Sequence, residues 1–296
     1  MSKLTAFLDL TRAHFIPAWI LIFTAGFATG TVYYGGFSLI LLLKVILIGA
    51  FGFEAGMVLN DWVDRDLDKK EQDHGLTKYF RFFKTRPLVL GTLSPRQALA
   101  TAIALASIAV GLIITLPSPH CWYVLVVMLY SYIVEYFYQI KKRKQQCPYS
   151  QLIGRTDFAL FPVAGYLVIG HPDFLALMYF LFFYALAEAH LGINDLADLI
   201  NDKAKKLVTI PRLYGSKGTV YWIGGFLFVH IVLSVIFIFN FQSKALPGFL
   251  LSYALLILVG YKIANSPKPK TALQFLPLVH GAMALQAIAL ILSAWF

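Results

Sequence analysis

Long apolar runs recur along the whole chain and constrain its fold more than any other feature. A helix that crosses a bilayer needs roughly 20 apolar residues. Nine windows of about that length cover residues 14–33, 37–60, 96–116, 119–140, 152–170, 173–195, 219–240, 245–263 and 272–295. Only 14% of the 296 residues are charged, whereas soluble proteins carry about a quarter. The sequence therefore predicts an all-α polytopic membrane protein, with residues 1–296 in a single transmembrane domain.

The basic residues are distributed unevenly between the two sides of the predicted bundle. With nine spans, 22 of the 25 Lys and Arg residues fall at the N-terminus and in the loops after every second span. The exceptions are Lys44, Arg155 and Lys244. The positive-inside rule assigns the basic face to the cytoplasm and the C-terminus to the outside. Topology thus accounts for most of the net charge of +10, and the expected surroundings are a lipid bilayer rather than nucleic acid.

One acidic pattern, E-A-x4-N-D-x2-D-x3-D-K, closes two of the apolar runs. The first copy spans residues 54–69 and the second spans 188–203, with every matched position offset by 134. The pattern's polar members are Glu54, Asn60, Asp61, Asp64 and Asp68 in the first copy, and Glu188, Asn194, Asp195, Asp198 and Asp202 in the second. The offset predicts an internal repeat. An even number of spans separates the copies, so both are expected at the cytoplasmic side.

The spacing of each copy suits a cation site. If the helix continues past the membrane edge, Asn60, Asp64 and Asp68 share one face, with Cβ atoms of neighbours about 5–6 Å apart. The second copy repeats this spacing. Mg²⁺ prefers such oxygen ligands and shares phosphate oxygens with its substrates. We expect metal ligation by Asp64, Asp68, Asp198 and Asp202, and substrate contacts from Asn60, Asn194, Asp61 and Asp195. The alternative for each copy is a solvated helix end.

Several basic and aromatic residues are expected on the same face. Tyr138 precedes Lys142 by one helical turn at the end of the fourth span, although an interfacial stop with Tyr136 and Lys141 explains much of that cluster. Arg155 suits bidentate phosphate binding, or pairs only with Asp157. Arg12, at the start of the first span, either faces the site or only anchors its helix, and Arg86 is a similar candidate. Glu54 and Glu188 lie deeper and either act in the site or tie the repeat helices together.

Two further expectations concern three histidines and the longest loop. His14, His190 and His280 are dispersed along the chain and are expected in the core or at interfaces rather than as ligands. The loop over residues 61–95 is basic and contains the aromatic run Tyr79-Phe80-Arg81-Phe82-Phe83. It is predicted to form an amphipathic cap on the cytoplasmic membrane face.

The motifs together resemble those of the UbiA superfamily of intramembrane prenyltransferases. Asn60-Asp61-x2-Asp64-x3-Asp68 and Asp195-x2-Asp198-x3-Asp202 are similar to its two acidic motifs. The matching shorter elements are Arg86-Pro-Leu with Gly91-Thr-Leu-Ser-Pro, Tyr138-x3-Lys142, and Thr209-x-Pro with Gly215. The chain departs from the family pattern at residues 73–84, which look inserted and affect how the cap closes.

The resemblance implies about nine helices around a central cavity and a Mg²⁺-bound isoprenyl diphosphate. It implies transfer of the prenyl group to a lipophilic acceptor, either an aromatic ring or a lipid alcohol. Asp64, Asp68, Asp198, Asp202, Tyr138 and Lys142 would be the catalytic set, and Tyr138 would stabilise an allylic cation. The rival class is a secondary transporter with a cytoplasmic-side ion site. Transporter sites favour broken helices at the bilayer midplane, whereas these acids lie at one surface.

Overall fold

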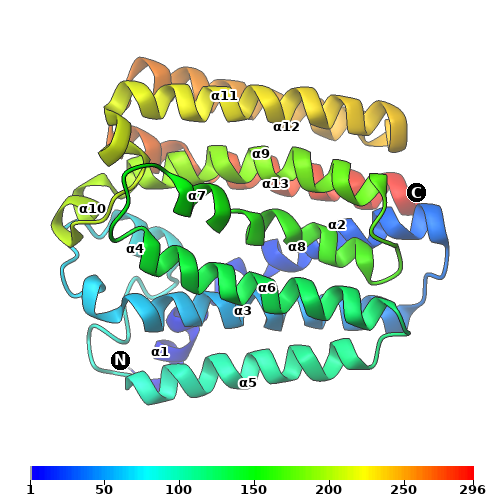
Figure 1. The fold of residues 1–296 in the computed structure, drawn as a ribbon, viewed down its shortest axis with the longest axis horizontal. Coiled ribbons are helices and arrows are strands. Elements are labelled where there is room, and N and C mark those ends of the chain that lie inside the picture. The colour runs from blue at the N-terminus through cyan, green and yellow to red at the C-terminus, as the bar shows by residue number, and fades with distance from the viewer. Residues whose placement is uncertain (1) are drawn as a thin grey trace.

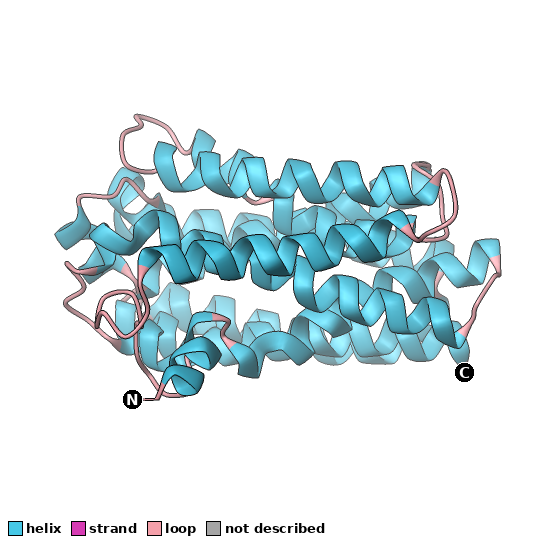
Figure 2. Cartoon of the chain, turned by 90° about the horizontal axis from the view of Figure 1, so that it is seen from below, coloured by secondary structure: helices cyan, strands magenta, loops and turns pink. Residues whose placement is uncertain are grey.

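The computed structural model describes residues 2–296, and every regular element in this range is a helix (Figures 1 and 2). Eight helices are long and apolar enough to cross a membrane, which confirms the predicted class. The long helices are α2 (Ile16–Tyr34), α3 (Leu39–Asp68), α5 (Pro95–Ile114), α6 (His120–Lys141), α9 (Phe174–Ala197), α11 (Ile210–Phe241), α12 (Leu246–Asn265) and α13 (Pro269–Trp295). The short ones are α1 (Lys3–Leu10), η1 (Ala13–Phe15), α4 (Gly75–Phe80), α7 (Tyr149–Gly154), α8 (Thr156–Leu167), α10 (Leu199–Lys205) and η2 (Ser243–Ala245).

The fifth predicted span is not one continuous helix. It consists of α7 and α8, which meet at Arg155 (φ −79°, ψ −3°). At the end of α7, a Cβ on Gly154 would lie 2.8 Å from the ring of Tyr138, so only glycine lets α7 pack against α6 there. The break matters for the site because it turns the Arg155 side chain into the bundle.

Helix α9 lies at the centre of the bundle, packed against α8, α11 and α13, and almost all of its residues are buried. Beside it, α2 and α8 approach until their backbones touch. A Cβ on Gly26 would lie 1.8 Å from the Pro162 carbonyl oxygen, and one on Gly165 would lie 2.0 Å from that of Phe23. Small residues allow this close packing in membranes, where apolar burial alone does not drive helix association.

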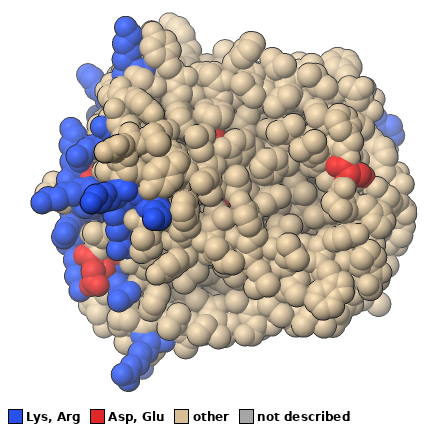
Figure 3. Space-filling view, in the orientation of Figure 1, with Lys and Arg blue, Asp and Glu red and all other residues tan. Residues whose placement is uncertain are grey.

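The two ends of the bundle differ in structure and charge. The N-terminus, α4 and α10 lie at one end, and the C-terminus lies at the other (Figure 1). Lys and Arg side chains gather at the end that carries α4 and α10 (Figure 3). Within residues 61–95, α3 continues to Asp68, and α4 with the turns around it covers the bundle end. We call residues 69–94 the cap.

Candidate active site

A polar cavity of about 190 Å³ opens at the capped end, between α3, α6, α9, α10 and the cap. Of the twelve residues that the sequence singled out for the site, eleven line it. They are Arg12, Asn60, Asp64, Asp68, Tyr138, Lys142, Arg155, Asn194, Asp195, Asp198 and Asp202. The structure therefore brings both acidic motifs, separated by 134 positions, to one cavity.

Helix α3 carries the first motif without interruption, because Asp68 is its last residue. Asp64 and Asp68 are each 6% exposed, and each binds two cations. Asp64 accepts from Lys142 Nζ at 2.8 Å and from Arg143 Nη2 at 3.1 Å. Asp68 accepts from Arg86 Nη1 at 2.6 Å and Lys205 Nζ at 2.8 Å. The first pair of carboxylates is thus fully compensated by basic side chains.

The second motif is built differently. Helix α9 ends at Ala197, and Asp198 (φ −93°, ψ 6°) separates it from α10, so Asn194, Asp198 and Asp202 do not share one regular helix as expected. Asp198 accepts from Asn201 Nδ2 at 2.6 Å and Asp202 accepts from Thr209 Oγ1 at 2.7 Å. Burial, together with the charges of Asp195 and Asp198, raises the pKa of Asp202 well above its ordinary value. This half of the cavity favours an added cation.

Asp61 does not line the cavity. Its carboxylate binds two arginines instead. Oδ1 accepts from Arg12 Nη2 at 3.0 Å, and Oδ2 accepts from Arg81 Nη2 at 2.5 Å. Both arginines line the cavity, so Asp61 holds them in place. Asp195 has a comparable supporting contact, since its Oδ2 accepts from the Ile210 backbone N–H at 3.2 Å.

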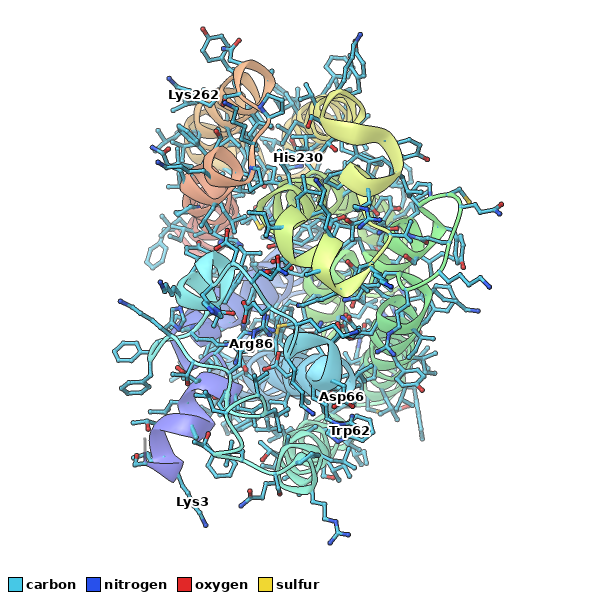
Figure 4. All side chains as sticks on the ribbon, turned by 90° about the vertical axis from the view of Figure 1, so that its left-hand side faces the viewer. Lys3, Trp62, Asp66, Arg86, His230 and Lys262 are labelled. Carbon is cyan, nitrogen blue, oxygen red and sulfur yellow. The ribbon has the colours of Figure 1, made fainter. Side chains whose placement is uncertain are left out.

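The cap contributes two arginines, of which the sequence analysis treated Arg81 only as part of the basic loop. Arg81 is 3% exposed, and Arg86 binds both Asp68 and Glu71, at 2.6 and 2.7 Å. In the end-on view Arg86 lies within the helices, while Lys3 and Lys262 lie at the rim (Figure 4). Asp66 also lies outward, with a side chain that is 70% exposed. Lys205, which the sequence analysis did not name as a site residue, links α10 to Asp68.

On α6, the structure resolves which Tyr and Lys face the cavity. Lys142 Nζ lies 4.9 Å from the centre of the Tyr138 ring, and both line the cavity, whereas Tyr136 is 51% exposed. Lys142 also donates to Gln139 Oε1. Burial alone would lower the pKa of Lys142, but the adjacent Asp64 carboxylate raises it above the ordinary value. Lys142 therefore remains a cation.

Five buried polar atoms of cavity-lining residues have no hydrogen-bond partner: Arg12 Nε, Trp19 Nε1, Arg155 Nε, Asn194 Oδ1 and His190 Nδ1. Unpaired buried polar atoms are rare in folded proteins and call for an explanation, such as a ligand that completes them. Two of them belong to cations, which fits an anionic ligand. By contrast, Glu54 and Glu188 are buried at 2% and 0% exposure and line neither this cavity nor the apolar one beside it.

An apolar chamber of about 90 Å³ adjoins the polar cavity between α2, α3, α5, α6 and α8. Phe53, Met57, Glu135, Arg155 and Phe158 line both spaces, so the two meet there. Along α6 the chamber extends from Glu135 to Val124, which is about 16 Å at 1.5 Å per residue. At the junction, Glu135 Oε1 accepts from Asn60 Nδ2 at 2.7 Å and from Gln139 Nε2 at 2.5 Å.

His190 and His280, which lie 90 positions apart in the sequence, meet in the structure. Their Nε2 atoms lie 2.9 Å apart, and both residues line the polar cavity. The repeat contained a signal for this. His190 occupies the position that Gly56 occupies in the first copy, 134 residues earlier, on the face that Asn60 and Asn194 share.

The carboxylates suit a hard divalent cation that is completed by a ligand. Among residues 2–296, no group of three or more His, Cys, Asp or Glu side chains is close enough to hold a metal ion alone. Mg²⁺ typically uses one or two carboxylates, waters and substrate phosphates. Asp198 and Asp202 lack basic partners and offer free carboxylate oxygens. The donor set therefore fits Mg²⁺ bound together with phosphate oxygens.

Fold and cavity define an intramembrane enzyme that handles an anionic headgroup with an apolar tail. The chain belongs to the UbiA prenyltransferase family, whose model matches residues 19–290. It is 26% identical to the protoheme IX farnesyltransferase of Baumannia cicadellinicola over 267 residues, 88% of each chain. It is 24% identical to the digeranylgeranylglyceryl phosphate synthase of Methanococcus aeolicus over 273 residues, 91% of this chain and 90% of that one.

The same fold occurs in a UbiA homolog from Archaeoglobus fulgidus, in a structure bound to GPP and Mg²⁺. The TM-score is 0.68 at 19% identity, over 98% of this chain and 99% of that one. The chain is thus a membrane-embedded prenyltransferase of this family. Its reaction is prenyl transfer from a prenyl diphosphate to a lipophilic acceptor. The names of the two relatives specify different prenyl acceptors, so they do not single one out.

Proposed function

We propose that this protein binds an isoprenyl diphosphate with its headgroup in the polar cavity and its tail in the apolar chamber. The transfer is then Mg²⁺-dependent, to an aromatic ring or a lipid alcohol. One observation carries the proposal: both acidic motifs and six basic side chains converge on a polar cavity that opens directly into an apolar one. A diphosphate with a prenyl chain has this same division between a charged and an apolar end.

The metal ligands in this proposal are Asp64, Asp68, Asp198 and Asp202, and the GPP and Mg²⁺ bound in the Archaeoglobus homolog support it. Bound Mg²⁺ would supply positive charge that neutralises the leaving diphosphate. The protein's own cations do part of the same work. Lys142, Arg155 and Arg12 place fixed positive charge around the cavity before the reaction begins, and such preorganised charge is worth more in a site without bulk water.

The prenyl chain lies in the chamber beside the rings of Phe53 and Phe158, which also exclude water. When the bond between the allylic carbon and the diphosphate oxygen breaks, the electron pair leaves with the diphosphate. The Tyr138 ring stabilises the carbon's positive charge. Lys142 Nζ already lies 4.9 Å from the centre of this ring, so the ring faces the charged end of the cavity.

In the membrane, we propose that the capped end faces the cytoplasm and the C-terminus faces outward. The gathering of Lys and Arg at the capped end supports this orientation (Figure 3). The two termini lie at opposite ends of the bundle, as an odd number of crossings requires (Figure 1). Prenyl diphosphate would then enter from the leaflet next to the cap.

The test is turnover by purified protein in detergent with Mg²⁺. Farnesyl and geranylgeranyl diphosphates are each combined with protoheme IX, 4-hydroxybenzoate or a monoalkyl glyceryl phosphate, and products are identified by mass spectrometry. We expect one prenylated product to dominate and diphosphate to be released in equal amount. Absence of a prenylated product in all combinations, with protein that still binds the diphosphate, would contradict the proposal.

A further inference from the structure

Two histidines and a tyrosine form a hydrogen-bonded chain from the cavity to the cap. His190 of α9 and His280 of α13 are joined through their Nε2 atoms at 2.9 Å. The Tyr79 hydroxyl of α4 lies 2.6 Å from His280 Nδ1. The last nitrogen, His190 Nδ1, is buried and has no hydrogen-bond partner, although His190 lines the cavity. One end of the chain is therefore free for a ligand.

The position of His190 places that free end beside the reacting atoms. His190 precedes Asn194 by four residues, so it lies on the same face of α9, one turn deeper in the membrane. A diphosphate held by the acidic motifs has its allylic carbon on this deeper side. The equivalent position in the first repeat is Gly56, where an added Cβ would approach only Tyr132, at 3.8 Å. One wall thus offers an imidazole and the other offers space.

The chemistry of the chain links its two ends. Of the two facing Nε2 atoms, only one carries the hydrogen at any time. If His190 Nε2 donates, His190 Nδ1 is an open base and His280 Nδ1 donates to the Tyr79 oxygen. If His280 Nε2 donates, His190 Nδ1 carries a proton and Tyr79 donates to His280 Nδ1. A proton that arrives at His190 therefore converts the first state into the second.

We propose that His190 accepts the proton that the prenyl acceptor loses, and that His280 and Tyr79 pass a proton on to the cap. This inference rests on the proposed prenyl transfer. The allylic C–O bond breaks with its electron pair on the diphosphate, and the prenyl acceptor forms the new bond. The acceptor's proton binds His190 Nδ1, and the His190 Nε2 proton moves to His280 Nε2. The His280 Nδ1 proton then moves to the Tyr79 oxygen, which releases its own proton to water.

The surroundings of His190 favour transfer of the proton to His280 and Tyr79 over its retention on His190. Arg155 lines the same cavity, and its positive charge disfavours an imidazolium at His190. Tyr79 is half-buried, and burial raises its pKa to about 12, so its phenol stays protonated between turnovers. His190 is the catalytic residue in this proposal, because it takes the proton from the acceptor. His280 and Tyr79 are positioning residues, because they act through His190.

The experiment compares His190→Ala with His171→Ala, an exposed histidine in the loop before α9, away from the capped end. The assay uses the diphosphate and acceptor pair that the wild-type protein turns over fastest. We expect His190→Ala to lower kcat about 100-fold, as for loss of a general base, with geranylgeranyl diphosphate binding changed less than about twofold. Added imidazole should restore at least about a tenth of the activity by filling the vacated space. His171→Ala should match the wild-type protein.

Tyr79→Phe tests the outer end of the chain. It keeps the ring against Phe15 and His280 but removes the hydroxyl, so kcat should fall about 10-fold, without rescue by imidazole. An unchanged kcat in His190→Ala would overturn the inference. So would equal losses of binding and kcat without imidazole rescue, because these indicate a purely structural role. If the wild-type protein itself yields no prenylated product, the proposed function fails instead.

Discussion

Lys142 Nζ donates to Asp64 Oδ2 at 2.8 Å, so a cation expected at the phosphate is held by a carboxylate expected at the metal. Both side chains are buried, at 10% and 9% side-chain exposure. Removing one member of a buried ion pair leaves the other charge uncompensated. The pairing therefore compensates both of these charges until substrate and metal arrive. Their joint binding would let both partners exchange, Lys142 to phosphate and Asp64 to the metal.

The first prediction concerns this exchange. Lys142→Met should raise the KM for prenyl diphosphate and lower kcat, with kcat/KM reduced about 100-fold, because one charge-assisted contact is lost at the transition state. Lys141→Met is the matched control, since Lys141 is the exposed neighbour. Steady-state kinetics with both variants check this. Equal effects of the two changes would show that Lys142 contributes only to the general charge of this end.

A second prediction separates the acidic residues of α3 by their direction. Asp64→Ala and Asp68→Ala should each lower kcat by two orders of magnitude or more, as should Asp198→Ala and Asp202→Ala. Asp66→Ala should remain within about twofold of the wild-type protein, because Asp66 pairs only with the surface residues Arg65 and Lys69. Thermal unfolding in detergent shows which losses come from misfolding. A comparable loss in well-folded Asp66→Ala would contradict the register of α3.

A third prediction follows from the donor set. Product formation should stop in excess EDTA and return with Mg²⁺ or Mn²⁺, because phosphate and carboxylate oxygens together complete the coordination of such ions. Isothermal titration should show tighter Mg²⁺ binding in the presence of prenyl diphosphate than in its absence. Full turnover in EDTA would remove the metal from the proposal.

The fourth prediction concerns the apolar chamber. Met128 is 8% exposed and lines it, whereas its neighbour Leu129 is 49% exposed on the outside of α6. Met128→Trp should shift the kcat/KM ratio about 10-fold in favour of geranyl over geranylgeranyl diphosphate, because pocket size discriminates by about that much for small changes. Leu129→Trp should leave the ratio unchanged. An unaltered ratio in folded Met128→Trp would place the prenyl chain elsewhere.

A fifth prediction addresses orientation. Lys78, Lys217 and Lys244 are exposed, so single cysteines there can be labelled without disturbing the core. An impermeant maleimide should react with the Lys78→Cys and Lys217→Cys variants only from the cytoplasmic side, and with Lys244→Cys only from outside. Labelling of Lys78→Cys should slow when prenyl diphosphate and Mg²⁺ are bound. Labelling of that residue from outside would reverse the proposed topology.

Local sequence patterns predicted the parts of the fold that depend on local physics. Hydropathy located the spans, and the i, i+4, i+8 spacing located one face of α3 from Asn60 to Asp68, because a regular helix fixes that geometry. The break at Arg155 was not predicted, since it depends on the packing of Gly154 against Tyr138 of another helix. The interruption at Asp198 was missed because α10 continues the acidic spacing.

The long-range pairings were beyond local patterns. Arg81, Arg86 and Lys205 reach their carboxylate partners across 20, 18 and 137 positions, and the positive-inside rule offered a sufficient explanation for Arg81 and Lys205. His190 did leave a signal, because it stands opposite Gly56 at one of the variable positions of the repeat. We infer that the two repeat-related walls of the cavity have different roles at this position.

Asn201 ties the cap to the second motif. Its Oδ1 accepts from the backbone N–H groups of Gln72 and Asp73, both at 2.8 Å, and its Nδ2 donates to Asp73 O at 2.8 Å and to Asp198 Oδ1 at 2.6 Å. Closure of the cap and the hydrogen bonding of Asp198 are therefore thermodynamically linked. A ligand that weakens or strengthens the hydrogen bond between Asn201 and Asp198 changes the stability of the closed cap. By the same free energy, closing the cap changes the affinity for that ligand.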